Sequence, residues 1–198
     1  YFYNMNKNRL EAFSDGVIAI IITIMVLELK MPHTSEWSAL KELIPVFISY
    51  VFSFTYVGIY WNNHHHLLHA TKHISAGIMW SNHALLFFLS LVPFRTAWMG
   101  ENHFAQNTVI AYSILLMLCG IAYTILQRAI ESCHKIDPLM AKVYRGQARK
   151  GYMSLFMYMM AIIAAFFDTL ISGLFFFVVS VMWIIPDKNI ERVLAGEQ

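Results

Sequence analysis

Six long apolar stretches, separated by shorter polar ones, dominate the sequence. None shows the strict two-residue alternation that is typical of a membrane β-barrel. The first stretch, Leu10–Leu29, has 20 residues and would measure about 30 Å as a helix, which is the thickness of a bilayer's hydrocarbon core. We therefore predict an all-α integral membrane protein with six transmembrane helices: Leu10–Leu29, Leu43–His66, Ile74–Phe94, Asn102–Gln127, Gly151–Phe167 and Thr169–Pro186.

The connections between these stretches differ in length. Asp168 predicts a very tight turn between the last two helices, whereas Glu131–Lys150 is predicted to be the longest connection. Pro93 lies near the end of the third stretch and predicts a kink or a helix end there, because proline has no N–H to donate. No internal repeat or Gly/Ser linker interrupts the chain, so we expect residues 1–198 to form a single domain.

The first stretch combines a regular apolar pattern with an unusual acidic residue. Ile20, Thr23, Ile24 and Leu27 recur at helical spacing, so they share one stripe of the predicted helix. Asp15 lies about 140° round the helix from Ile20, so the two side chains face different neighbours. An ionised carboxylate inside a membrane span costs several kcal/mol unless it has a partner, which makes Asp15 a candidate functional residue.

Composition supports the assignment to a membrane. The chain of 198 residues is 58% hydrophobic and 13% charged, with a mean hydropathy of +0.54, whereas soluble domains average about 25% charged residues. Cys119 and Cys133 make no disulfide framework and are expected to be free thiols. A net charge of +2 is too small to indicate nucleic-acid binding. The first apolar stretch lacks the short core and cleavage site of a signal peptide.

The distribution of basic residues predicts the orientation in the membrane. If both termini lie on one side, that side collects 11 of the 14 Lys and Arg residues. The other side then carries Lys30, Lys41 and Arg95. Because basic residues concentrate in cytoplasmic loops, we expect both termini to be cytoplasmic, in agreement with an even number of spans.

Polar side chains on the second and third helices are candidate partners for the head of the first. Arg9 and Asp15 are six residues apart and cannot pair along one helix, so each needs a partner from another helix. The candidates near the same end are Trp61, His64, His65, His66, Asn82 and His83.

The histidines leave a second interpretation open. His65, His69 and His73 recur at four-residue spacing and could hold a metal ion. A zinc site usually adds Cys or carboxylate ligands at recognisable spacing, and the sequence offers none nearby. We therefore favour hydrogen bonding to the first helix, or placement at the membrane interface, over metal binding.

The sequence lacks the motifs of several other classes of membrane protein. It has no Thr-Val-Gly-Tyr-Gly filter, no Arg ladder of a voltage sensor, no P-loop and no His-Glu-x-x-His. No group of residues supports catalysis, so we expect no enzymatic activity and no cofactor.

The head of the first helix carries a specific motif. It reads Arg9-x-x-x-Phe13-Ser14-Asp15-Gly16 and is followed by Ala19-Ile20-x-x-Thr23 and by Leu27. In these residues the chain resembles the endosomal–lysosomal potassium channel family, and in particular its prokaryotic branch. Animal members carry two six-helix units per chain and this chain carries one. The resemblance therefore implies a homotetramer in the plasma membrane of a prokaryote.

The resemblance also implies roles for single residues. The first helix would line the pore, and Ile20 would form its constriction. The residues expected along the pore are Ile20, Thr23, Ile24 and Leu27. The residues expected to hold this helix against the second and third are Arg9, Phe13, Ser14, Asp15, Trp61, His65 and Asn82.

These observations favour a potassium-preferring cation channel that conducts passively through a hydrophobic constriction. One alternative is a secondary transporter of a small cation or metabolite. Such proteins often have two similar halves, with a helix broken near mid-membrane at the corresponding position of each half. Gly58, Gly77, Gly120 and Gly173 show no such pairing. An intramembrane enzyme built on the histidines and Asp15, and a non-conducting scaffold, are the remaining alternatives.

Overall fold

The computed structural model describes residues 7–32, 34–69, 71, 73–133 and 138–185. Most of these residues are helical, as the long apolar stretches predict. The helices are α1 (Lys7–Leu27), α2 (Trp37–Glu42), α3 (Ile44–His69), α4 (Ala76–Ser90), α5 (Val92–Glu101), α6 (Gln106–Cys133), α7 (Pro138–Ala165) and α8 (Thr169–Ile184).

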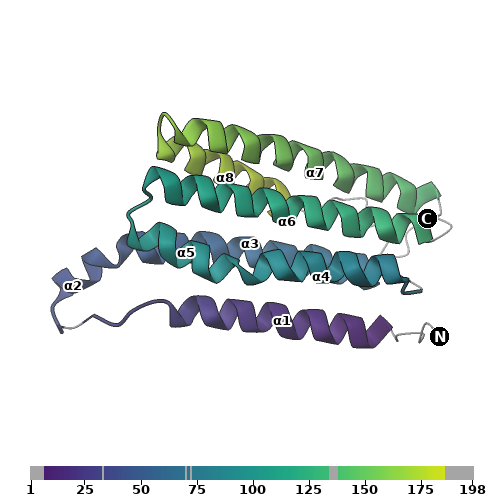
Figure 1. The fold of residues 1–198 in the computed structure, drawn as a ribbon, viewed down its shortest axis with the longest axis horizontal. Helices are drawn as coiled ribbons and strands as arrows, with labels where there is room; N and C mark the ends of the chain where they lie inside the picture. The colour runs from purple at the N-terminus through teal and green to yellow at the C-terminus, as the bar shows by residue number, and fades with distance from the viewer. Residues whose placement is uncertain (1–6, 33, 70, 72, 134–137, 186–198) are drawn as a thin grey trace.

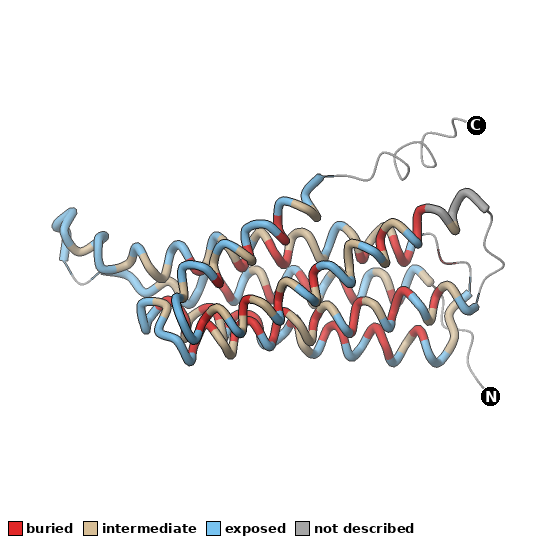
Figure 2. The backbone as a smooth tube through the Cα atoms, turned by 90° about the horizontal axis from the view of Figure 1, so that it is seen from above, coloured by how far each residue is buried: buried red, intermediate tan, exposed pale blue. Residues whose placement is uncertain are grey.

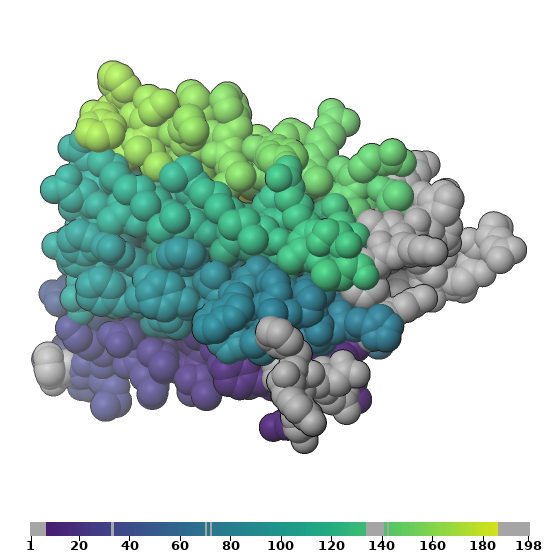
Figure 3. All heavy atoms as spheres, turned by 45° about the vertical axis from the view of Figure 1, so that its right-hand side comes forward, coloured from purple at the N-terminus to yellow at the C-terminus, as the bar shows by residue number. Residues whose placement is uncertain are grey.

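The long helices lie side by side in a bundle, with α1 at one margin and α7 and α8 at the other (Figure 1). The space-filling view also shows α1 and α8 on opposite sides of the molecule (Figure 3). Helices that follow one another in sequence pack together, notably α6 with α7 and α7 with α8. The tight turn expected at Asp168 is present, because Asp168 Oδ1 accepts a hydrogen bond at 2.8 Å from the Leu170 N–H of α8.

Four helical units are long and apolar enough to cross a membrane: α1, α3, α4 together with α5, and α6. The apolar helix α8 has only 16 residues, or about 24 Å at 1.5 Å per residue. The helix α7 has 28 residues, but its first half is polar. The all-α architecture is therefore confirmed, while the count of six spans stays a prediction.

Some element boundaries differ from the prediction. The third stretch continues past Phe94 to Glu101, because α5 extends it. The fifth helix begins at Pro138 instead of Gly151, so much of the predicted connection Glu131–Lys150 is helical. An apolar pattern cannot reveal this polar half of α7, because Lys, Arg, Gln and Ala form helix well without an apolar run.

The third span is interrupted where Pro93 predicts it. Helix α4 ends at Ser90 and α5 begins at Val92, because the proline has no N–H to continue the helical hydrogen bonds. At the break, the Leu91 N–H donates to Phe88 O at 3.2 Å. The two halves still follow one another along the bundle (Figure 1), so α5 extends the span of α4 toward the opposite end.

The core lies between the helices, where buried positions alternate with exposed ones along each helix (Figure 2). Val57, Leu85, Leu89 and Leu126, which come from α3, α4 and α6, are completely buried. These three helices therefore form the centre against which α1 packs on one side and α7 and α8 on the other.

A buried chain of hydroxyl groups connects α5 to α3 and α6. Thr96 Oγ1 lies 2.6 Å from Ser53 Oγ, which lies 2.8 Å from Tyr112 Oη. Ser49 Oγ lies 3.1 Å from the backbone oxygen of Thr96. Hydrogen bonds between membrane helices contribute about 0.6 kcal/mol each to stability. The value is small because the same groups also find protein partners when the helices are apart.

Gly100 allows α5 to approach α3 closely. A Cβ atom at Gly100 would lie 2.5 Å from Ser49 Oγ and 2.7 Å from Val46 Cα. We expect Gly100→Ala to lower the free energy of unfolding by about 1–3 kcal/mol, the usual cost of overpacking, as measured by chemical unfolding in detergent. Gly173→Ala is the control, since nothing lies within 4 Å of its Cβ position. An equal loss in both variants would contradict this account.

Candidate functional site

Helix α1 presents two different faces. The buried face packs against α3, α4 and α5. Its residues are spaced three or four apart and are Leu10, Ser14, Ile18, Ile21 and Met25. The helix is therefore attached to the bundle along one side only.

The opposite face of α1 carries the stripe that the periodicity identifies. Ile20 is 60% exposed, Ile24 41% and Leu27 75%, and Thr23 is exposed as well. The four side chains thus share one outward face of the single chain. Their role in lining a pore stays a prediction, because one face of one helix cannot enclose a conduit.

Thr23 is the polar member of this stripe. Its hydroxyl donates a hydrogen bond to the backbone oxygen of Ala19 at 2.9 Å. The hydroxyl hydrogen is therefore used within the helix, and the oxygen lone pairs remain as acceptors on the exposed face. An acceptor at this position suits a cation and disfavours an anion.

Asp15 has the partner that a carboxylate in a membrane span requires. Trp61 Nε1 of α3 donates a hydrogen bond to Asp15 Oδ1 at 3.0 Å. Asp15 is half-buried, and Trp61 is 44% exposed. The contact joins α1 to α3 on the side of α1 that faces away from the exposed stripe.

Ser14, Asn82 and His64 form a line of hydrogen bonds across α1, α4 and α3. Asn82 Nδ2 donates to Ser14 Oγ at 3.0 Å, and Asn82 Oδ1 lies 2.6 Å from His64 Nε2. Ser14 Oγ in turn donates to Leu10 O at 2.8 Å. Because Asn82 uses its amide nitrogen to bind Ser14, its oxygen faces His64. An amide oxygen only accepts, so His64 Nε2 carries the hydrogen and donates it to Asn82 Oδ1. All three polar side chains are completely buried, so the line holds the head of α1 inside the bundle.

His64, and not His65, is the histidine that bonds Asn82. The imidazole of His65 points toward Glu11 of α1 instead of Asn82 of α4. Its Nδ1 lies 3.2 Å from Glu11 Oε1, without the geometry of a hydrogen bond. Consecutive residues of a helix point about 100° apart. Both histidines are therefore near the α1 side of α3, and spacing alone does not show which of them bonds Asn82.

Among the described residues, no group of three or more His, Cys, Asp or Glu side chains could hold a metal ion.

Phe13 and Arg9 lie on the exposed side of α1. The ring of Phe13 stacks on that of His83 with 5.7 Å between centroids, and Phe13 is 51% exposed. Arg9 is exposed and forms no hydrogen bond or ion pair with a described residue of the chain. The structure therefore brings Phe13 to α4 but does not bring Arg9 into the hydrogen-bonded network.

Lys30 and Glu101 join the other end of α1 to α5. The Lys30 ammonium donates a hydrogen bond to Glu101 Oε1 and forms an ion pair with it. This hydrogen bond and the charge of Glu101 raise the pKa of Lys30 above its ordinary value. The apolar pattern does not predict the pair, because it ends the third helix at Phe94, before Glu101. The segment of α1 that carries the exposed stripe thus lies between two attachments to the bundle.

Comparisons with known proteins place the chain in a family. A sequence model described as endosomal/lysosomal potassium channel TMEM175 matches residues 9–93. A potassium channel of Chryseobacterium sp. (strain P1-3) is 50% identical over 190 residues, which cover 96% of this chain and 98% of that relative. The chain belongs to the TMEM175 family.

Two further comparisons agree with this assignment. A potassium channel of Streptomyces collinus is 32% identical over 144 residues, covering 68% of this chain and 70% of that protein. The crystal structure of a lysosomal potassium-selective channel TMEM175 homologue from Chamaesiphon minutus matches with a TM-score of 0.80 and 25% identity, over 90% of this chain and 96% of that chain. The match confirms the all-α membrane fold.

Asn82 is the centre of the buried network in this TMEM175 protein. Replacing it by Ala leaves Ser14 and His64 without that partner, and a buried polar group in this state costs about 1–3 kcal/mol. We therefore expect Asn82→Ala to lower the free energy of unfolding by about that amount, measured by chemical unfolding in detergent. Asn62→Ala, at an exposed position of α3, is the matched control and should change stability by less than about 0.5 kcal/mol. Unchanged stability of Asn82→Ala would argue against the network.

Proposed function

We propose that the chain is a potassium-preferring cation channel in which α1 lines the pore. The observation that carries the proposal is the exposed stripe on a helix whose other face is held by buried hydrogen bonds. A helix held in this way can present aliphatic side chains to a narrow conduit without rotating. The names of the Chryseobacterium and Streptomyces relatives, both potassium channels, support potassium as the permeant ion.

The conduit requires several copies of the chain. One chain contributes one α1, and its stripe can border a pore but cannot enclose it. We propose a homotetramer in which four α1 helices surround one axis, with residues 1–198 of each copy acting as a single six-helix domain. The number four is supported by the resemblance of this one-unit chain to channels built from two such units.

A ring of four Ile20 side chains would form the constriction. Aliphatic side chains offer no ligand to replace the water around an ion, so a narrow ring can close by dewetting and can act as a size filter when open. Potassium holds its water less tightly than sodium, so a tight apolar ring favours potassium. Thr23, one turn farther along, would offer the ion a lone pair. Selectivity should be modest compared with that of a filter made of carbonyl oxygens.

The chain is proposed to span the plasma membrane of a prokaryote several times, with both termini in the cytoplasm. This orientation puts 11 of the 14 Lys and Arg residues on the cytoplasmic side, as the usual bias of membrane proteins requires. The buried network of α1 then lies near the cytoplasm, and the Lys30–Glu101 pair lies near the outer surface.

A secondary transporter is less well supported. Such proteins often carry helices that are broken at corresponding positions of two halves. In the described part of this chain, the break between α4 and α5 lies inside a span, whereas the break between α2 and α3 lies at the beginning of one, so the two breaks do not correspond. A channel needs no catalytic group, and the proposal includes neither a catalytic residue nor a cofactor.

Shortening Ile20 tests the constriction. We expect Ile20→Ala to leave folding intact, because the side chain is 60% exposed in the single chain. A wider ring admits ions with more of their water, so the preference for potassium over sodium should fall several-fold. Reversal potentials under opposed potassium and sodium gradients in planar bilayers would measure it.

Val26→Ala is the matched control for this experiment. Val26 is also exposed on α1, at 44%, but it lies on a different side of the helix from Ile20. Its reversal potential should equal that of the wild type. Identical ion preference in the wild type and Ile20→Ala would count against Ile20 as the constriction.

A further inference from the structure

Arg95 is a charged side chain inside a membrane-spanning unit. The helices α4 and α5 together form the span Ala76–Glu101, and Arg95 lies six residues, or about 9 Å along the helix, before the end of this span. A cation at this depth is costly and generally has a definite partner. A partner for Arg95 is therefore expected.

The described part of the chain supplies no carboxylate to Arg95. Among the described residues, none forms an ion pair or a side-chain hydrogen bond with its guanidinium. Glu101, which lies on the same helix, already binds Lys30, which follows the end of α1. The positive charge of Arg95 is thus uncompensated within the described part of the chain.

Aromatic rings flank Arg95 on the outward face of α5. Its guanidinium carbon lies 5.4 Å from the ring centroids of both Phe94 and Trp98, and Phe94 is 63% exposed. The buried residues of α5 lie on its other face and are Val92, Pro93, Thr96, Met99 and Gly100. Arg95 therefore sits at the edge of the bundle, beside Trp98, a residue type that is enriched where hydrocarbon meets lipid headgroups.

We propose that Arg95 binds the phosphate group of a phospholipid in the leaflet at this end of the bundle. A guanidinium presents parallel N–H donors that match two phosphate oxygens, and it is more weakly hydrated than an ammonium. Its carbon stem can stay in hydrocarbon while the charged group extends toward the headgroups. The acyl chains would lie along the outward face of α4 and α5, where Phe87, Leu91 and Phe94 are exposed.

A lipid at Arg95 would act on the helix that holds the outer end of α1. Helix α5 binds the segment that follows α1 through the Glu101–Lys30 pair. It binds α3 through Thr96 and Ser53, whose side-chain oxygens are 2.6 Å apart. Any effect of the lipid on ion flux rests on the proposed channel function. Lipid binding itself needs no conduction, so the two proposals can fail independently.

Native mass spectrometry of the purified protein in mild detergent measures the binding. The probe is phosphatidylglycerol, and the comparison lipid is diacylglycerol, which has the same chains and no phosphate. Arg95→Gln removes the charged hydrogen bonds to the phosphate, so it should weaken phosphatidylglycerol binding about tenfold or more and leave diacylglycerol binding unaffected. Arg95→Lys should keep part of the preference, because it retains the charge. Lys41→Gln, at an exposed position of α2, is the matched control and should bind as the wild type does.

Equal phosphatidylglycerol binding by the wild type and Arg95→Gln would overturn the proposal. Full competition by inorganic phosphate would also overturn it, because Arg95 would then bind a soluble anion. A third result would also overturn the proposal: the Arg95→Gln oligomer dissociates while phosphatidylglycerol stays bound. This result would mean that the wild-type Arg95 binds another copy of the chain and not a lipid. Potassium flux into liposomes with and without phosphatidylglycerol tests conduction separately: no flux in any protein would count against the channel and leave the binding result standing.

Discussion

The hydrogen bonds that join the head of α1 to α3 and α4 are the constraint on which the rest of the structure depends. Lipid tails are as apolar as Leu, so apolar burial gives a membrane helix little reason to prefer one rotation about its axis. Ser14 bonded to Asn82, and Asp15 bonded to Trp61, remove this freedom. Rotating α1 by one residue would leave these polar groups in hydrocarbon without partners, at a cost of several kcal/mol.

Once the rotation of α1 is determined, the rest of its surface follows. The buried side continues through Ile18 and Met25, and the opposite side carries Ile20 and Leu27 outward. At the far end, α5 adds a second attachment through the ion pair with Lys30. The exposed segment is therefore held at both ends and uncovered between them, which is the arrangement that the proposed pore-lining role of α1 requires.

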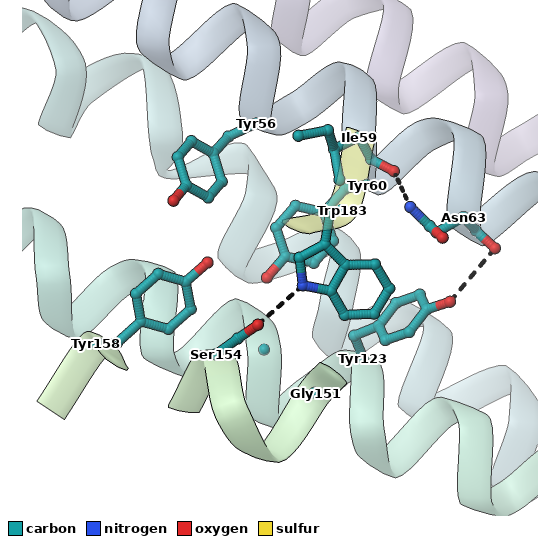
Figure 4. Close-up of a pocket in the computed structure, with 10 residues that line it drawn as sticks. Tyr56, Ile59, Tyr60, Asn63, Tyr123, Gly151, Ser154, Tyr158 and Trp183 are labelled. Carbon is teal, nitrogen blue, oxygen red and sulfur yellow. Dashed lines mark hydrogen bonds between the residues drawn. The ribbon is translucent and has the colours of Figure 1, made fainter. Parts of the chain in front are cut away.

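In other parts of the bundle, too, apolar contacts fill the core and polar contacts determine how the helices are oriented. Large apolar side chains fill the space between α3, α4 and α6, whereas a few hydroxyl and aromatic groups decide how the helices meet. Tyr123 Oη, for example, donates to Asn63 O at 3.4 Å, and Trp183 Nε1 donates to Ser154 Oγ at 2.8 Å, in a small cavity between α3, α6, α7 and α8 (Figure 4). Such directional bonds select one packing among many that apolar burial alone would allow.

The sequence by itself determined the helical membrane class, the stripe on the first helix, the interruption at Pro93 and the turn at Asp168, because each depends on residues close together in the chain. The tertiary structure alone decided that His64 bonds Asn82, that His65 faces Glu11 of α1 and that Arg9 stays outside the network. It also decided that Glu101 meets the end of α1, across a large separation in sequence. Helical periodicity gives the direction of a side chain within one helix, but the rotation and depth of a neighbouring helix depend on packing over its whole length, which no local pattern contains.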